Sequence, residues 1–230
     1  TVVVTVTHDG YLKRTPLSVY KQQKRGGKGI IAAGTKEEDV VENLFVTSTH
    51  SSMLFFTNKG RAHSIKVYQI PEGTRQARGK AVVNLVSLES GEKVTAMVPV
   101  DDYNGGKYLL LCTKKGVVKK TSLELFSKPR QGGVIAILLD EGDDLIGALL
   151  TTGERRLLLA TKNGSAVRFE EKDVRPMGRA SRGVRGIRLK GDDQVVAAAI
   201  PEETNDIFTI TTHGYGKRTP VSDYRLISRG

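Results

Sequence analysis

The 230-residue sequence contains no tryptophan and a single cysteine, Cys112. One cysteine cannot form a disulfide within the chain, which excludes a disulfide-stapled secreted fold and favours a reducing, cytoplasmic location. No apolar run reaches the roughly 18 residues that a membrane helix needs, and no signal-peptide pattern opens the chain. We therefore expect a cytoplasmic protein with no membrane partner. Because a strand pattern begins at once at Thr1, we also expect the chain to be a piece of a longer polypeptide.

The sequence also lacks the residue patterns that enzymatic and metal chemistry require. Its four histidines are isolated, and no second cysteine is present to complete a metal site. No GxSxG pattern of a nucleophile elbow occurs. We therefore assign no catalytic residue, no metal ligand and no cofactor to this chain.

Acidic residues are fewer than basic residues in this sequence. The sequence has 36 Lys and Arg residues against 25 Asp and Glu residues, which gives a formal net charge of +11. This balance favours a polyanionic partner, of which nucleic acid is the most common kind.

The chain does contain an internal repeat of about fifty residues. In each of five units a glycine marks a turn, a threonine stands three residues before it, and a short apolar run precedes the threonine. The glycines are Gly10, Gly60, Gly116, Gly164 and Gly214, and the threonines are Thr7, Thr57, Thr113, Thr161 and Thr211. Such a period is typical of stacked or radially arranged units. We predict a single domain over 1–230, with units at about 1–51, 52–106, 107–154 and 155–204 and an incomplete unit at 205–230.

Each unit reads as four short strands that are rich in β-branched residues and bounded by turn residues. In the third unit we expect strands at 108–113, 117–123, 134–139 and 145–150, and the third strands of other units at 29–33, 81–85 and 184–189. No segment has a sustained helical period. The pattern predicts an all-β, propeller-like fold of four-stranded blades. A β-sandwich is the structural alternative, but it does not predict so regular a repeat.

Basic residues recur at matched positions in the units, which predicts a basic outer rim. One set follows the turn glycine by three or four residues, and another lies in the loop after the second strand, whereas acidic residues gather in the turn between the third and fourth strands. The predicted rim cations are Lys13, Arg14, Arg75, Arg78, Lys80, Lys119, Lys120, Lys128, Arg130, Arg168, Arg179, Arg182, Arg185, Lys217, Arg218 and Arg229. A belt of this kind would neutralise successive phosphates with little regard to base sequence. The alternative is that these charges only keep the loops solvated.

The loop of the first unit has a chemistry of its own. It reads Gln23-Lys24-Arg25-Gly26-Gly27-Lys28-Gly29, so it combines three cations with three glycines, which let backbone N–H groups approach a phosphate. Arg25 can bind phosphate oxygens through two N–H groups. The loop is not a nucleotide-binding P-loop, because no Ser or Thr follows Lys28. We predict that all seven residues bind the phosphates of a nucleic acid.

This heptad looks like the gyrase A box, the signature of the C-terminal domain of bacterial gyrase A subunits, which form one family with the A subunits of topoisomerase IV; the resemblance implies that the heptad binds DNA. The loops 77–81 and 182–187 resemble the degenerate loops of those domains, and the resemblance covers the whole chain. It implies a β-pinwheel, in which neighbouring blades exchange strands and DNA bends around the outer rim. Family domains have six blades, whereas this sequence has four full units and a fifth that stops at Gly230. Lys24 stands where the family often has Arg.

The resemblance also implies a role inside a larger enzyme. The domain would wrap duplex DNA and present it to the strand-passage core, so that DNA gyrase introduces negative supercoils in an ATP-dependent reaction. The implied partners are duplex DNA, the N-terminal strand-passage part of the gyrase A subunit and the gyrase B subunit, in a heterotetramer associated with the bacterial nucleoid. ATP and magnesium would be used by other parts of that enzyme, and this domain would have no catalytic activity of its own.

Other functions remain open at this point. The chain could be the tail of the topoisomerase IV A subunit, which discriminates DNA geometry, although that branch usually has a degenerate box or none. A basic propeller could also be a scaffold that binds RNA or protein, or an enzyme with its site in the central funnel. Cations on the outer rim favour DNA binding, whereas polar residues clustered at the axis favour a funnel enzyme.

Overall fold

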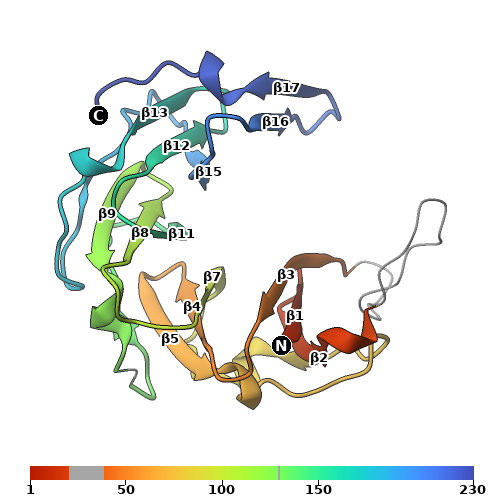
Figure 1. Cartoon of the computed structure of the whole chain (residues 1–230). Coiled ribbons are helices and arrows are strands. Elements are labelled where there is room, and N and C mark those ends of the chain that lie inside the picture. Colours follow the sequence, from red (N-terminus) through yellow and green to blue (C-terminus); the bar gives the residue numbers. More distant parts are fainter. Residues whose placement is uncertain (21–38, 129) are drawn as a thin grey trace.

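The computed structural model describes residues 1–20, 39–128 and 130–230, and these form short strands and 3-10 turns. The strands make five antiparallel sheets, which we call blades 1 to 5, arranged along an open arc (Figure 1). From the concave to the convex side, the orders are β3-β1-β2-β6, β7-β4-β5-β10, β11-β8-β9-β14, β15-β12-β13 and β16-β17. The predicted all-β, propeller-like class of fold is confirmed.

The strands that lie toward the concave side and in the middle of the blades are five to seven residues long. In blades 1 and 2 they are β1 (Val2–Thr7), β2 (Tyr11–Pro16), β3 (Val41–Thr47), β4 (Ser52–Thr57), β5 (Arg61–Lys66) and β7 (Val94–Val100). In blades 3 to 5 they are β8 (Tyr108–Thr113), β9 (Val117–Ser122), β11 (Leu145–Thr151), β12 (Arg156–Thr161), β13 (Ala166–Glu170), β15 (Val195–Ala199), β16 (Asp206–Ile210) and β17 (Gly216–Pro220).

The outermost strand of blades 1 to 3 is donated by the following repeat. These strands are β6 (Lys80–Ala81), β10 (Val134–Ile135) and β14 (Val184–Arg185), which pair with β2, β5 and β9. The predicted third strands at 81–85, 134–139 and 184–189 are therefore wrong in length, because only two residues of each repeat pair with the preceding blade. The apolar residues that follow, such as Ile137 and Ile187, are buried between blades instead. The prediction at 29–33 falls outside the described residues.

Short 3-10 turns follow the second strand of every unit. They are η1 (Leu17–Val19), η2 (Val67–Gln69), η4 (Leu123–Phe126), η5 (Glu171–Asp173) and η6 (Val221–Asp223), and η3 (Val82–Asn84) follows β6. Among the residues that the structure describes, no helix has the length and apolar character needed to cross a bilayer.

The hydrophobic core lies between blades, which explains why the apolar runs of the sequence do not alternate with polar residues. On β8, Leu109 and Leu111 belong to the cluster shared with blade 2, whereas Leu110 and Cys112 belong to the cluster shared with blade 4. Both faces of such a strand are buried, so every position is apolar. The hairpin of blade 5 lacks this cover, and its Phe208 is 66% exposed.

The repeated threonine and glycine build the hairpin turn of each unit. In blade 3 the N–H of Gly116 donates to the carbonyl of Thr113, and the threonine hydroxyl accepts from the N–H of Val117 at 3.1 Å. Gly116 has φ +84°, a conformation that favours glycine. This turn places the second strand, with its cations, at the same phase in every unit.

The acidic residues before the fourth strand stabilise the same hairpin turns. The carboxylates of Asp39, Asp143 and Asp193 accept the N–H groups of Asp9, Lys115 and Asn163, at 3.0, 2.8 and 3.0 Å. Burial alone would raise the pKa of Asp193, but its hydrogen bonds, from the Thr161 hydroxyl and from backbone N–H groups, hold that pKa below its ordinary value. The acidic turns therefore have a structural role of their own.

Candidate nucleic-acid interface

The cations that follow the turn glycine by three residues are buried in blades 1 and 3. Lys13, on β2, is 1% exposed, and its ammonium donates to the carbonyl oxygens of Thr74 and Ala77, both at 2.8 Å, and of Arg75. Lys119, on β9, is 0% exposed and donates to the carbonyls of Ala136, at 2.7 Å, and Arg179. Burial lowers the pKa of Lys119 to about 8, and the positive charge of Arg179 acts in the same direction.

The cations one position further on tie each blade to the 3-10 turn of the next repeat. Arg14 donates from Nε to the carbonyl of Ile70 at 2.8 Å, just after η2. Lys120 donates to the carbonyl of Glu171 at 3.1 Å, in η5, and its ammonium is 3.7 Å from that side chain's carboxylate.

Arg168 has the same role in blade 4. It donates to the carbonyls of Val221 and Tyr224, each at 3.2 Å, in and just after η6, and it pairs with Glu203. In three of the five units, therefore, the side chain four residues after the turn glycine bonds one repeat to the next.

The prediction that Lys13, Lys119, Lys120 and Arg168 lie on the outer rim is wrong. Lys13, Lys119 and Lys120 lie on β2 and β9, one position inside the convex edge of their blades, where segments of the following repeat cover them. Arg168 lies on β13, the outermost strand of blade 4, but it is 4% exposed because residues in and after η6 cover it. Arg14 is only half-buried, but its guanidinium is already bonded to the carboxylate of Glu72 at 2.6 Å. The recurrence of cations at these positions reflects contacts between repeats.

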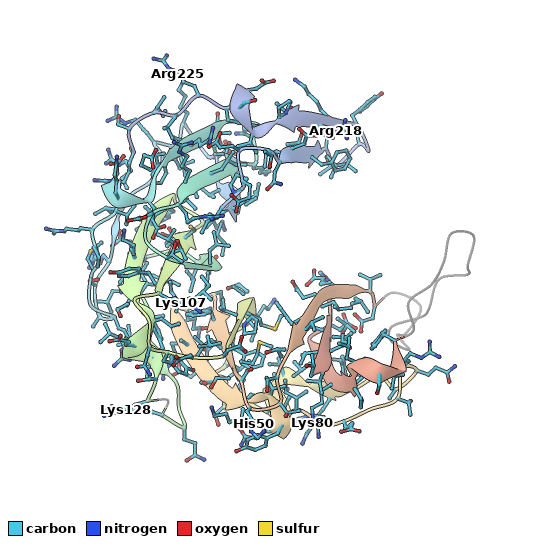
Figure 2. All side chains as sticks on the ribbon, in the orientation of Figure 1. His50, Lys80, Lys107, Lys128, Arg218 and Arg225 are labelled. Atoms are coloured by element: carbon cyan, nitrogen blue, oxygen red, sulfur yellow. The ribbon has the colours of Figure 1, made fainter. Side chains whose placement is uncertain are left out.

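The remaining predicted cations are accessible. Those classed as exposed are Lys80, Lys128, Arg130, Arg182, Arg185, Lys217 and Arg218, and those that are half-buried are Arg75, Arg78, Arg179 and Arg229. In Figure 2, the labelled Lys80 and Lys128 lie on the convex side of the arc, as does Arg225.

Several of these side chains are held by specific contacts. The guanidinium of Arg78 lies 3.6 Å from the centre of the Tyr11 ring, and Arg229 donates to the carbonyl of Arg185 at 2.8 Å. Arg182 and Arg218 pair with Asp140 and Asp206, at 2.5 and 3.2 Å. Exposed ion pairs of this kind contribute little to folding, so the two arginines remain available to another anion.

A groove of about 520 Å³ lies where repeats 2, 3 and 4 meet, and three arginines line it. They are Arg61 on β5, Arg130 on the loop after η4, and Arg179 on the loop after η5. The other lining residues that the structure describes are apolar or glycine. The Glu89 carboxylate, which is not part of this lining, lies 3.7 Å from the guanidinium of Arg61. Three guanidinium groups in one concave site can bind the oxygens of a phosphate with charge-assisted hydrogen bonds.

Arg61 was not among the predicted rim residues. It follows the turn glycine directly, and the other units have Tyr11, Val117, Ser165 and Tyr215 at this position. Because the position carries no recurrent charge, the repeat could not reveal it. Only the meeting of three repeats brings Arg61 beside Arg130 and Arg179.

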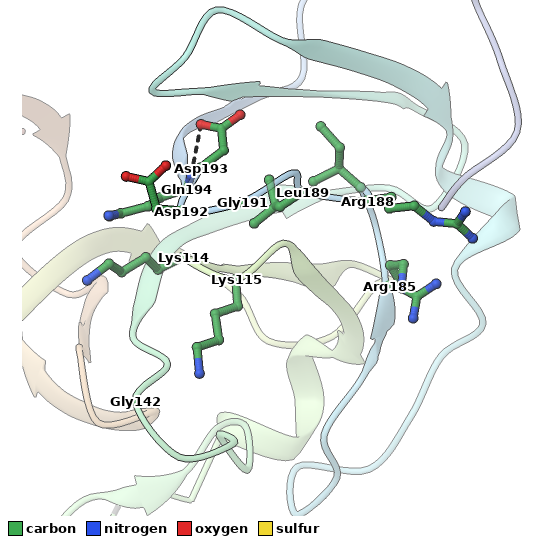
Figure 3. Close-up of a pocket in the computed structure, with 11 residues that line it drawn as sticks. Lys114, Lys115, Gly142, Arg185, Arg188, Leu189, Gly191, Asp192, Asp193 and Gln194 are labelled. Carbon is green, nitrogen blue, oxygen red and sulfur yellow. Dashed lines mark hydrogen bonds between the residues drawn. The ribbon is translucent and has the colours of Figure 1, made fainter.

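A second hollow, of about 530 Å³, lies between blades 3 and 4 and has mixed charge (Figure 3). Four cations, Lys114, Lys115, Arg185 and Arg188, line it together with the carboxylates of Asp192 and Asp193. The two carboxylates lower the positive potential that the four cations give this hollow.

The heptad of the first unit, Gln23 to Gly29 with Lys24, Arg25, Gly26, Gly27 and Lys28, lies outside the described residues. Its assignment to DNA stays a prediction from the sequence. Within residues 1–20, 39–128 and 130–230, no group of three or more His, Cys, Asp or Glu side chains is placed to hold a metal ion.

The chain matches a family model described as the DNA gyrase C-terminal domain, beta-propeller, over residues 1–48, 51–101, 107–152, 155–202 and 205–230. It is 49% identical over 228 residues to the A subunit of DNA gyrase from Salmonella typhimurium and from Escherichia coli, and 44% identical over 232 residues to that from Staphylococcus epidermidis. These alignments cover 99% of the chain, or 100% for the third, and 26% of each relative. The chain thus spans about a quarter of the length of the curated relatives it matches.

Two solved structures resemble the fold over the whole chain. The C-terminal domain of DNA topoisomerase IV matches with a TM-score of 0.85 at 30% identity, and 70% of that chain is covered. The DNA gyrase A C-terminal domain matches with a TM-score of 0.77 at 28% identity, and 74% of that chain is covered.

Proposed function

Because this chain belongs to the DNA gyrase C-terminal domain family, we propose that it binds duplex DNA along the convex side of its arc and bends it. The observation that carries the proposal is the groove lined by Arg61, Arg130 and Arg179, a concave cationic site whose described lining contains no carboxylate. Other exposed cations, such as Lys128 on the loop that carries Arg130 and Arg185 on β14, add to the accessible positive charge.

The proposed contact is with the phosphate backbone. Arginine matches phosphate oxygens through paired N–H groups, and each neutralised phosphate releases counterions, so affinity depends strongly on salt and little on base sequence. On sequence grounds, the heptad 23–29 is proposed as the strongest phosphate clamp.

Bending follows from the shape of the arc. Bending a short duplex by tens of degrees costs on the order of several kcal/mol, which contacts at successive positions must offset. Blades placed along a curve offer such contacts one after another (Figure 1).

Within the larger enzyme, we propose that the bent duplex is delivered to the strand-passage part of the gyrase A subunit. With the gyrase B subunit, ATP and magnesium supplying the chemistry elsewhere, this delivery would bias strand passage toward negative supercoils. The domain would cleave no DNA and hydrolyse no ATP, and it would act at the nucleoid in the bacterial cytoplasm.

A second candidate role is that of the corresponding domain of topoisomerase IV, in which the surface distinguishes DNA geometries. The structural likeness to that domain, at a TM-score of 0.85, favours it. The intact heptad 23–29 favours the gyrase role.

The proposal is tested by measuring the affinity of the 230-residue chain for two unrelated duplexes between low and high salt. We expect similar affinities for both and a log–log slope of about −0.9 for each phosphate contacted. Combining Arg130→Ala with Arg179→Ala should make the slope less negative, by about 1.8 if each arginine contacts one phosphate. Lys162→Ala, which removes an exposed cation from the β12–β13 turn, is the matched control. A flat salt response, or a strong preference for one sequence, would contradict the proposal.

A further inference from the structure

We propose that the buried lysines Lys13 and Lys119 are positioning residues for DNA binding. Each ammonium donates hydrogen bonds to backbone carbonyls of a loop in the following repeat, and that loop carries cations of the proposed interface. The inference rests on the proposed function, but it assigns a role to side chains that cannot themselves reach DNA in this structure.

Lys13 is bonded in a way that fixes one loop. Its ammonium has three N–H donors, and the carbonyls of Thr74, Arg75 and Ala77 accept them. No carboxylate of the described residues lies within 4 Å of it. A buried cation is costly to fold around unless its donors are satisfied, so this loop has one strongly preferred conformation.

The loop held by Lys13 carries three accessible cations, Arg75, Arg78 and Lys80. A second contact fixes the same loop, because Gly79 has φ +94° and a Cβ there would lie 2.6 Å from the carbonyl of Leu12. With the backbone held at both points, Arg78 rests over the Tyr11 ring.

Lys119 repeats the arrangement two blades further along. It bonds the carbonyl of Arg179, at the start of the loop that also carries Arg182 and Arg185, and the carbonyl of Ala136 from the crossover of the third repeat. The Lys119 ammonium is therefore bonded to the backbone of Arg179, whose side chain lines the groove of three arginines.

Folding alone does not explain a lysine at this position. In the fourth unit the equivalent residue is Val167, which is buried, and in the second it is His63, which is paired with Glu92 at 3.4 Å. In these units the blade accepts an apolar side chain, or a histidine bonded to a carboxylate, at the same position. The segments above Lys13 and Lys119 carry three accessible cations each, Arg75, Arg78 and Lys80 or Arg179, Arg182 and Arg185, whereas those above His63 and Val167 carry two each, Lys128 and Arg130 or Arg225 and Arg229.

The test is a double-mutant cycle on duplex affinity, measured over a range of salt concentrations with the 230-residue chain. Lys13→Met should flatten the log–log slope by about 1.8 or more, the equivalent of at least two phosphates, because the cations of one loop are misplaced together. Arg78→Ala should then add little in the Lys13→Met background. Arg179→Ala, on another blade, should add its full effect in that background.

Gly79→Ala displaces the same loop while leaving the lysine side chain in the sequence, because the new Cβ would lie 2.6 Å from the carbonyl oxygen of Leu12 and 3.3 Å from Cβ of Lys13, and it should reproduce the loss. If circular dichroism shows that Lys13→Met does not fold, two other variants test the inference. Gly79→Ala is then combined with Arg78→Ala, and Lys119→Met with Arg182→Ala, in the same double-mutant cycle. A loss equivalent to a single phosphate, additive with Arg78→Ala, would mean that Lys13 contacts DNA directly and would overturn the inference. Unchanged binding by a folded Lys13→Met would mean a purely structural role and would also overturn it. If the unmodified chain shows no salt-dependent binding, the proposed function itself fails.

Discussion

Replacing Gly116 by alanine should destabilise the protein through a contact between repeats. Gly116 has φ +84°, where a residue with a Cβ costs roughly 1–2 kcal/mol. A Cβ there would lie 2.8 Å from Cγ2 and 3.0 Å from the carbonyl oxygen of Ile187, which belongs to the following repeat. Such crowding in a packed site typically costs about 1–3 kcal/mol more.

Gly164 provides the matched control for this substitution. It occupies the same turn in the next unit with φ +86°, and no atom lies within 4 Å of its Cβ position. Gly164→Ala should therefore cost only the backbone strain, roughly 1–2 kcal/mol. The difference between the two variants isolates the clash with Ile187.

Urea unfolding followed by circular dichroism measures both variants. We expect the unfolding free energy of Gly116→Ala to lie about 1–3 kcal/mol below that of Gly164→Ala. Equal losses would refute the reasoning, because they would mean that Gly116 and Ile187 are not packed together as the structure places them.

Three further outcomes follow from individual buried groups. The pKa of Lys119 is about 8 in the folded protein and 10.5 in the unfolded chain, so the unfolding free energy should rise between these two pH values, by at most about 3 kcal/mol. Urea titrations at each pH measure this rise, and Lys119→Met should abolish it. Burial would raise the pKa of Glu92, but hydrogen bonds from Thr57, Glu89 and His63 hold it below its ordinary value of 4.5. The unfolding free energy should therefore fall as the pH drops through the folded pKa, and Glu92→Gln should weaken this pH dependence in acid unfolding curves. Burial raises the pKa of Cys112 to about 12, so mass spectrometry should find this thiol unalkylated by iodoacetamide at neutral pH until the protein is unfolded.

The hairpins of the fold could be predicted from the sequence because their signals are local. The apolar run before Thr113, the turn to Gly116 and the strand after it lie within fifteen residues, and β8 has the predicted bounds 108–113. The two-residue strands β6, β10 and β14 could not be predicted, because they pair with strands of the preceding repeat. A run such as 134–139 shows that residues are apolar, but not that the chain leaves the sheet after Ile135.

The candidate interface was predictable only in part for the same reason. The repeat gives the phase of each cation along its strand, and it correctly groups Lys13 with Lys119. It does not show that the loop of the next repeat covers both. Arg61 has no recurrent charge at its position, so its place beside Arg130 and Arg179 follows only from how three repeats meet.

The most direct test of the account is end-to-end energy transfer on a duplex labelled at both ends and bound to the 230-residue chain. We expect transfer to rise on binding, because the duplex follows the convex side of the arc. Arg130→Ala combined with Arg179→Ala should reduce this rise more than Lys162→Ala does. Binding with no change in transfer, or an equal effect of both substitutions, would contradict the claim that these cations bend DNA.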